Sequence, residues 1–171
     1  PARASDPNLT MHRTGATADD GMGWHRAVST KGSFEVLLPA PFNDFTLDGT
    51  AANIGAFAVH TLGCVANGVK LTVTEMPYTP RMTRASVDAL SATWTSNPLQ
   101  TVSDLERTQS GEEERLSLTV TRTAGTAGFI QYVLTPKALY TLIIEFQGRR
   151  TDEVRPIRDQ MFQSFKIRSA P

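Results

Sequence analysis

The sequence 57-FAVHTLGCVANGVKLTVTEM-76 carries the strongest local structural signal in the chain. Two runs rich in apolar and β-branched residues flank Asn67 and Gly68, a dipeptide preferred in two-residue type I′ turns because both positions need a positive φ. The stretch therefore predicts an antiparallel β-hairpin. On the register of a two-residue turn, the side chains that project from one side of this hairpin are those of His60, Leu62, Cys64, Leu71, Val73 and Glu75.

This register places His60 directly opposite Glu75. One interpretation is an acid–base pair, in which Glu75 raises the pKa of His60 and orients its ring. The other, which the four apolar neighbours favour, is a structural hydrogen bond at the edge of a hydrophobic core. Cys64 lies four residues from His60 on the same strand, with Cβ atoms roughly 13 Å apart. We therefore expect a small buried side chain at Cys64 and not a nucleophile paired with His60.

Three further strands are predicted downstream, joined by short turns. Residues 116–120 alternate apolar and polar side chains, residues 130–134 continue the alternation, and residues 139–146 place four apolar side chains on one face. Consecutive strands joined by short turns pair antiparallel, so this part of the chain predicts a meander. Upstream, residues 32–39 predict an edge strand, because Pro39 and Pro41 cannot donate to a ladder.

Two helices are expected beside the strands. Thr83 can cap a helix that ends near Ser96, and residues 151–165 place apolar side chains on one helical stripe, with Pro156 forcing an irregular start. The order of elements predicts an α+β fold, an antiparallel β-sheet with two helices packed on one face.

The length of 171 residues and a hydrophobic fraction of 40% predict a single folded domain. Residues 1–23 have no periodicity and are rich in Ala, Thr, Asp, Gly and Arg, which is typical of a flexible N-terminal tether. We therefore expect a tether over 1–23 and one α+β domain over 24–171. A tether of this kind follows a removed export signal or lipid anchor in many envelope proteins. It would place the domain in the periplasm or another extracytoplasmic compartment, free or tethered to a membrane.

The sequence lacks the signals that are typical of several classes of function. Lys and Arg number 17, as do Asp and Glu, so the chain lacks the positive field of a nucleic-acid-binding protein. One cysteine and three scattered histidines predict neither a disulfide nor a metal site. No glycine-rich nucleotide loop or nucleophile elbow occurs, so we expect no cofactor and no known enzyme design.

A cluster of basic residues surrounds the start of the last predicted helix. Exposed amides at a helix start could join these side chains in an anion site. Acidic residues at 152, 153 and 159 are interleaved with them, which favours a solvated, salt-bridged surface as the alternative. The basic residues are Arg149, Arg150, Arg155 and Arg158.

Three segments resemble the PsbP-like fold family: Gly32 to Pro39, the strand around Tyr140, and Phe162 to Ile167. The resemblance spans about Trp24 to Ile167. The family includes an extrinsic subunit of photosystem II, a Ran-binding nuclear transport factor and many bacterial envelope proteins. It implies a non-catalytic extracytoplasmic binding or assembly domain whose partner is a protein or a small ligand. The alternatives are a small enzyme using His60 and Glu75, or a cytoplasmic adaptor or chaperone.

Overall fold

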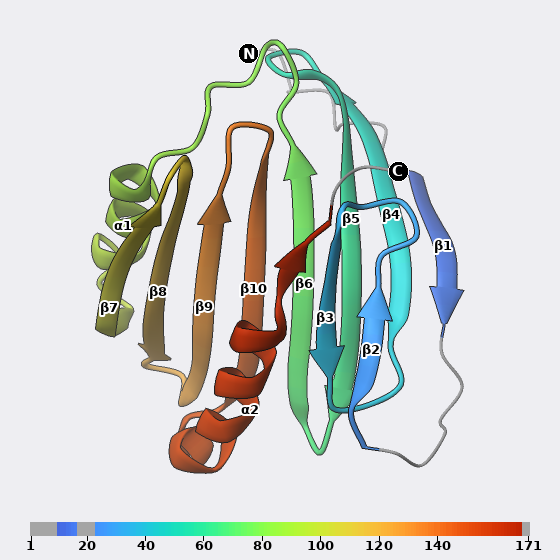
Figure 1. The fold of residues 1–171 in the computed structure, drawn as a ribbon. Helices are drawn as coiled ribbons and strands as arrows, with labels where there is room; N and C mark the ends of the chain where they lie inside the picture. The colour runs from blue at the N-terminus through green and yellow to red at the C-terminus, as the bar shows by residue number, and fades with distance from the viewer. Residues whose placement is uncertain (1–9, 17–22, 169–171) are drawn as a thin grey trace, which may run out of the picture.

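A computed structural model of the protein describes residues 10–16 and 23–168. Its framework is an antiparallel sheet in the strand order β1-β4-β5-β6-β10-β9-β8-β7 (Figure 1). These strands are β1 (Thr10–Ala16), β4 (Asn43–Ala51), β5 (Gly55–Ala66), β6 (Val69–Pro77), β7 (Gln100–Ser110), β8 (Glu113–Arg122), β9 (Thr126–Leu134) and β10 (Ala138–Gln147).

A second, three-stranded sheet packs in front of the large one in the view of Figure 1. Its order is β11-β3-β2, with β2 at His25–Val28, β3 at Phe34–Leu38 and β11 at Lys166–Ile167. The predicted strand near residues 32–39 is therefore present, but it lies at the centre of this small sheet and not at an edge. The reason is that β11, from the distant C-terminal segment, supplies its second neighbour.

The predicted hairpin forms β5 and β6. Asn67 and Gly68 have φ values of 49° and 75°, as a type I′ turn requires. The ladder runs from Ala66 opposite Val69 to His60 opposite Glu75, so the predicted register is confirmed. The predicted meander is also present, as β8, β9 and β10.

The two predicted helices are α1 (Val87–Thr95) and α2 (Thr151–Ser164), the latter preceded by a short 3-10 turn, η1 (Gly148–Arg150). The cap of α1 is Ser86, whose hydroxyl accepts from the amide of Ala89 at 3.2 Å, so the helix begins later than the predicted cap at Thr83. Pro156 lies inside α2. In the described part of the chain, no helix is long and apolar enough to cross a membrane.

The helices lie on opposite faces of the large sheet, which differs from the expectation that both cover one face. Alternate residues of β9 and β10 contribute to two separate hydrophobic cores. Val154 and Met161 of α2, with Phe165 directly after it, join the core beneath the small sheet, whereas Val87 of α1 joins the other. We call these the α2 face and the α1 face. The α+β class and the antiparallel sheet are as predicted.

One segment of the predicted tether belongs to the sheet. Residues 10–16 form β1, which pairs antiparallel with β4 from Thr10 opposite Asp48 to Ala16 opposite Asn43. Backbone pairing, which needs no particular side-chain pattern, explains why composition alone predicted a linker here. The remainder of the predicted tether, 1–9 and 17–22, lies outside the described residues, and Gly23 is the first residue described after it.

Candidate functional site

Glu75, one member of the predicted acid–base pair, is held in a buried hydrogen-bond network. Its side chain is on the α2 face, and the residue is 4% exposed. The Ser33 amide donates to Oε2 at 2.7 Å, the Ser33 hydroxyl donates to Oε1, and the Tyr140 hydroxyl donates to Oε1 at 3.1 Å. A Cβ added at Gly32 would lie 2.5 Å from Oε2, so the backbone closes over the carboxylate.

His60 has a different partner. Its Nδ1 lies 3.0 Å from the hydroxyl of Thr46 on β4, and no hydrogen bond joins it to Glu75 within the described residues. The sequence register brought the two side chains to adjacent positions, but the carboxylate is satisfied by the turn between β2 and β3. A general acid or base must reach its substrate. This geometry resembles a structural clamp between the two sheets more than a reaction centre.

The pKa of the Tyr140 hydroxyl makes the stability of the protein depend on pH in a way that can be measured. Burial raises the pKa of Tyr140 to about 12, and the charge of Glu75 adds to the rise, while the Ser33 hydrogen bond lowers it. An unfolded tyrosine titrates near about pH 10. Between these values the unfolded chain has lost the proton that the folded chain keeps, so stability falls as the pH rises from about 10 to about 12.

We expect urea unfolding to show this fall directly. The free energy of unfolding should decrease between about pH 10 and about pH 12, and the Tyr140→Phe variant should lose less over the same range. Burial also raises the pKa values of Tyr78 and Tyr132, so part of the fall should persist in the variant. An equal loss in the two proteins would contradict the assignment to Tyr140.

Cys64 is a buried apolar residue, as the register predicted. It is 5% exposed and belongs to the core of the α2 face. Burial raises the pKa of its thiol to about 11, so the thiolate that a nucleophile needs is disfavoured near neutral pH.

The arginine cluster lies along η1 and α2. Arg149 is exposed, and Arg150 donates through Nη1 to the Asn67 carbonyl at 2.7 Å, which ties the start of α2 to the hairpin turn. A bound anion would have to compete with the internal carboxylate partners of the other side chains. These pairs are Arg150 with Glu153 at 2.5 Å, Arg155 with Asp152 at 3.6 Å, and Arg158 with Asp159 at 2.6 Å.

A second candidate surface is the part of the α1 face formed by β4, β5 and β6. α1 packs against β7 and β8, at the far edge of the sheet, so no described helix covers this part. Cross-strand pairing puts the exposed side chains on one surface. We call it the open face, and its apolar members are Phe45, Leu47, Phe57, Val59 and Val65, of which the first four are half-buried and Val65 is 66% exposed.

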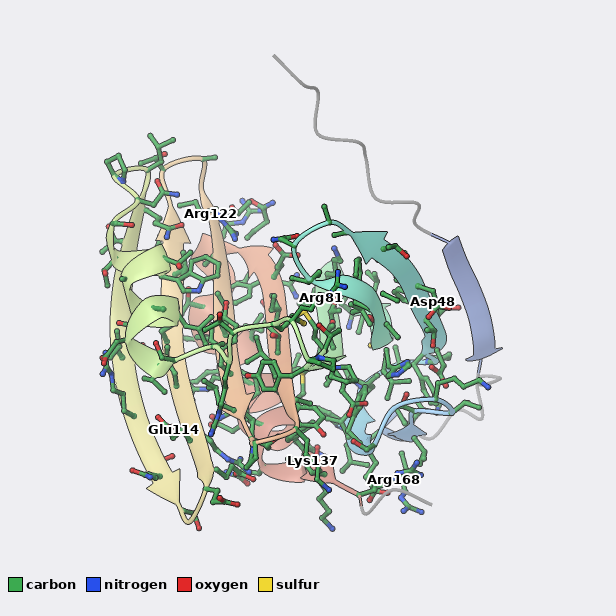
Figure 2. All side chains as sticks on the ribbon, turned by 90° about the horizontal axis from the view of Figure 1, so that it is seen from above. Asp48, Arg81, Glu114, Arg122, Lys137 and Arg168 are labelled. Atoms are coloured by element: carbon green, nitrogen blue, oxygen red, sulfur yellow. The ribbon has the colours of Figure 1, made fainter. Side chains whose placement is uncertain are left out.

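Two hollows lie at the ends of the open face. One, of about 210 Å³, is lined by Phe45, Gly63 and Val65, and the other, of about 550 Å³, is lined by Phe57, Asp48 and the loop that follows β6. Figure 2 shows Asp48 on β4 and Glu114 on β8 toward opposite edges of the large sheet. The open face is therefore separated from the region that α1 covers.

Sequence reasoning missed two of the five apolar members of the open face. Phe45 and Leu47 belong to β4, which was not predicted because the residues that alternate with them, Asp44 and Thr46, are polar yet buried. The alternation 43-NDFTL-47 was nevertheless present as a weak signal. No group of side chains able to hold a metal ion occurs among the residues the structure describes.

No family model and no curated protein sequence matches the chain. Among solved structures, the chain is similar to the solution structure of cyanobacterial PsbP (CyanoP) from Synechocystis sp. PCC 6803. The match covers 90% of this chain and 98% of that chain, with 15% sequence identity and a TM-score of 0.54. Identity at this level supports a shared fold without a shared activity. The comparison agrees with the resemblance seen in the sequence, and the chain has the PsbP-like fold.

Proposed function

We propose that this protein is a non-catalytic binding or assembly domain that docks a protein partner on its open face. The observation that carries the proposal is the unequal covering of the α1 face. Over β7 and β8 that face is packed under α1, whereas over β4 to β6 it presents Phe45, Phe57 and Val65 without a covering helix among the described residues. An apolar surface bordered by polar residues is typical of an interaction site.

The chemistry of the open face suits a neutral, flat partner surface. Thr72 and Thr74 of β6 are half-buried beside the apolar side chains of β5, and at the border of the face Lys70 is 3.5 Å from Glu145, so neither charge is left unmatched. The environment of Glu75 supports the non-catalytic part of the proposal, because the buried carboxylate already accepts hydrogen bonds from Ser33 and Tyr140.

We further propose an extracytoplasmic location. The tether-like composition of residues 1–23 supports it, as does the resemblance to bacterial envelope proteins of this fold. Fractionation of the native cells should recover the protein outside the cytoplasm, and it should be digested by protease in spheroplasts. Recovery with cytoplasmic enzymes would contradict this part of the proposal alone.

Site-directed photocrosslinking in the native cells tests the docking surface. A benzophenone amino acid at Val65, on the open face, should give a discrete adduct of higher mass, because a docked partner excludes water around that side chain. The matched control is the same group at Glu112, an exposed residue at the turn between β7 and β8. The Phe45→Arg substitution should remove the Val65 adduct, since it places a charge in an apolar contact. An absent adduct, or an equal one at Glu112, would contradict the proposal.

A further inference from the structure

A separate cavity of about 200 Å³ lies on the α2 face, between α2 and strands β7 to β9. Its floor is a cross-strand row in which Glu106 of β7, Ser117 of β8 and Gln131 of β9 are neighbours. Arg158 and Phe162 of α2 contribute to its wall. Nothing in the proposed docking on the open face uses this cavity, because the two sites are on opposite faces of the sheet.

A β-bulge aims a carboxylate into this region. The register of β7 against β8 shifts between Ser103 and Glu106, and Asp104, inside the shift, has a φ of 49°. Positive φ is uncommon for a residue with a side chain, and bulges re-aim side chains next to functional sites. The bulge brings Oδ2 of Asp104 to 2.9 Å from the Thr119 hydroxyl, which donates to it.

Gln131 supplies an independent observation that points to a ligand. The residue is only 8% exposed, and its side chain lines the cavity. Its Nε2 donates to the Ser117 hydroxyl at 3.0 Å, whereas its Oε1 has no hydrogen-bond partner among the described residues. Buried polar atoms almost always find a partner. The amide oxygen of Gln131 is therefore a buried acceptor in the wall of the cavity that no donor of the described residues satisfies.

The remaining groups of the cavity are also mainly acceptors. The Arg158 guanidinium lies 5.0 Å from the centre of the Phe129 ring and is bonded to Asp159, so its charge is already matched. Among the described residues, the carboxylates of Asp104 and Glu106 take part in no ion pair, since Arg107 pairs with Asp88 and Arg158 with Asp159. The site thus combines two unmatched negative charges, a free amide oxygen and an aromatic wall.

We propose that this cavity binds a small organic cation that carries N–H donors, an ammonium or guanidinium group on a short apolar chain. The N–H groups would satisfy Gln131 and the two carboxylates, and the chain would lie against the half-buried ring of Phe162. Charge-assisted hydrogen bonds to carboxylates are the strong ones. The volume is below the roughly 300–1,000 Å³ of sites for drug-sized ligands, so the ligand is small.

Titration of the isotope-labelled full chain with agmatine, which carries both cationic groups, tests this assignment. We expect saturable shifts of the Gln131 side-chain amide and of the Asp104 and Thr119 backbone amides. Butane-1,4-diol, which lacks the charge, and succinate, which reverses it, should leave these signals unmoved. Absence of saturable shifts up to about 10 mM agmatine would overturn the proposal, because a specific site should bind more tightly than that.

Variants separate a specific site from general attraction. Asp104→Asn keeps an oxygen for the Thr119 hydroxyl, so the bulge should persist while agmatine affinity falls at least about tenfold, and Glu106→Gln should act likewise. Glu112→Gln, which removes an equal charge at the β7–β8 turn, should bind as the parent does. Equal binding by Asp104→Asn, or the same shifts with Mg²⁺ in place of agmatine, would overturn the assignment to an organic cation.

Discussion

The Glu75→Ala variant is expected to lose about 2–4 kcal/mol in its free energy of unfolding. Glu75 is 4% exposed and accepts from the Ser33 amide, the Ser33 hydroxyl and the Tyr140 hydroxyl. A buried donor left without an acceptor costs about 1–3 kcal/mol. The two hydroxyls are 2.8 Å apart and can still bond to each other, so the Ser33 amide bears the largest penalty.

Urea unfolding followed by circular dichroism measures this loss. Glu75→Gln keeps an oxygen acceptor and should lose less than the alanine variant, while Glu112→Ala, at an exposed turn, should stay within about 0.5 kcal/mol of the parent. A loss below about 1 kcal/mol in Glu75→Ala would mean that the carboxylate does not clamp the two sheets. That result would reopen the acid–base interpretation of Glu75.

Truncation of Phe34 to alanine is expected to cost about 3–5 kcal/mol. Phe34 is fully buried on β3, and its ring centre lies 6.1 Å from that of Tyr140 and 6.2 Å from that of Phe165. Its ring thus joins the small sheet, the large sheet and the segment that follows α2. Removal of the ring leaves a cavity at this junction, which the surrounding strands can only partly fill.

Phe45→Ala is the matched control for this experiment, because Phe45 is half-buried on the open face. It should cost clearly less than Phe34→Ala, since the apolar area removed from water is smaller. Urea or thermal unfolding of the two variants gives the comparison. Equal losses would mean that Phe45 is as fully packed as Phe34 in the folded chain. The open face would then be covered and could not dock a partner.

Local signals in the sequence were sufficient for the hairpin and the meander. Asn67 and Gly68 define a turn whose geometry follows from two positive φ values, and the turn then sets every cross-strand pair from Ala66 to Glu75. Strands β8 to β10 alternate with a period of two, which depends on neighbouring residues alone. The burial of Cys64 followed from the same register.

Elements without such a pattern could not be predicted. β7 is polar and exposed along nearly all of its length, so its pairing with β8 has no apolar alternation to reveal it. The bulge at Asp104 and the cavity beside it depend on that pairing and on the approach of α2. β1 likewise joins the sheet through backbone bonds to β4.

The sequence by itself determined that His60 and Glu75 lie opposite each other, because a two-residue turn permits one register. Only the tertiary structure decided their partners: Glu75 binds Ser33 and Tyr140, which are 42 and 65 residues away, and His60 binds Thr46. It likewise decided that the two helices cover opposite faces. Both outcomes depend on which distant apolar surfaces pack together, and that choice is a property of the whole core which no local pattern contains.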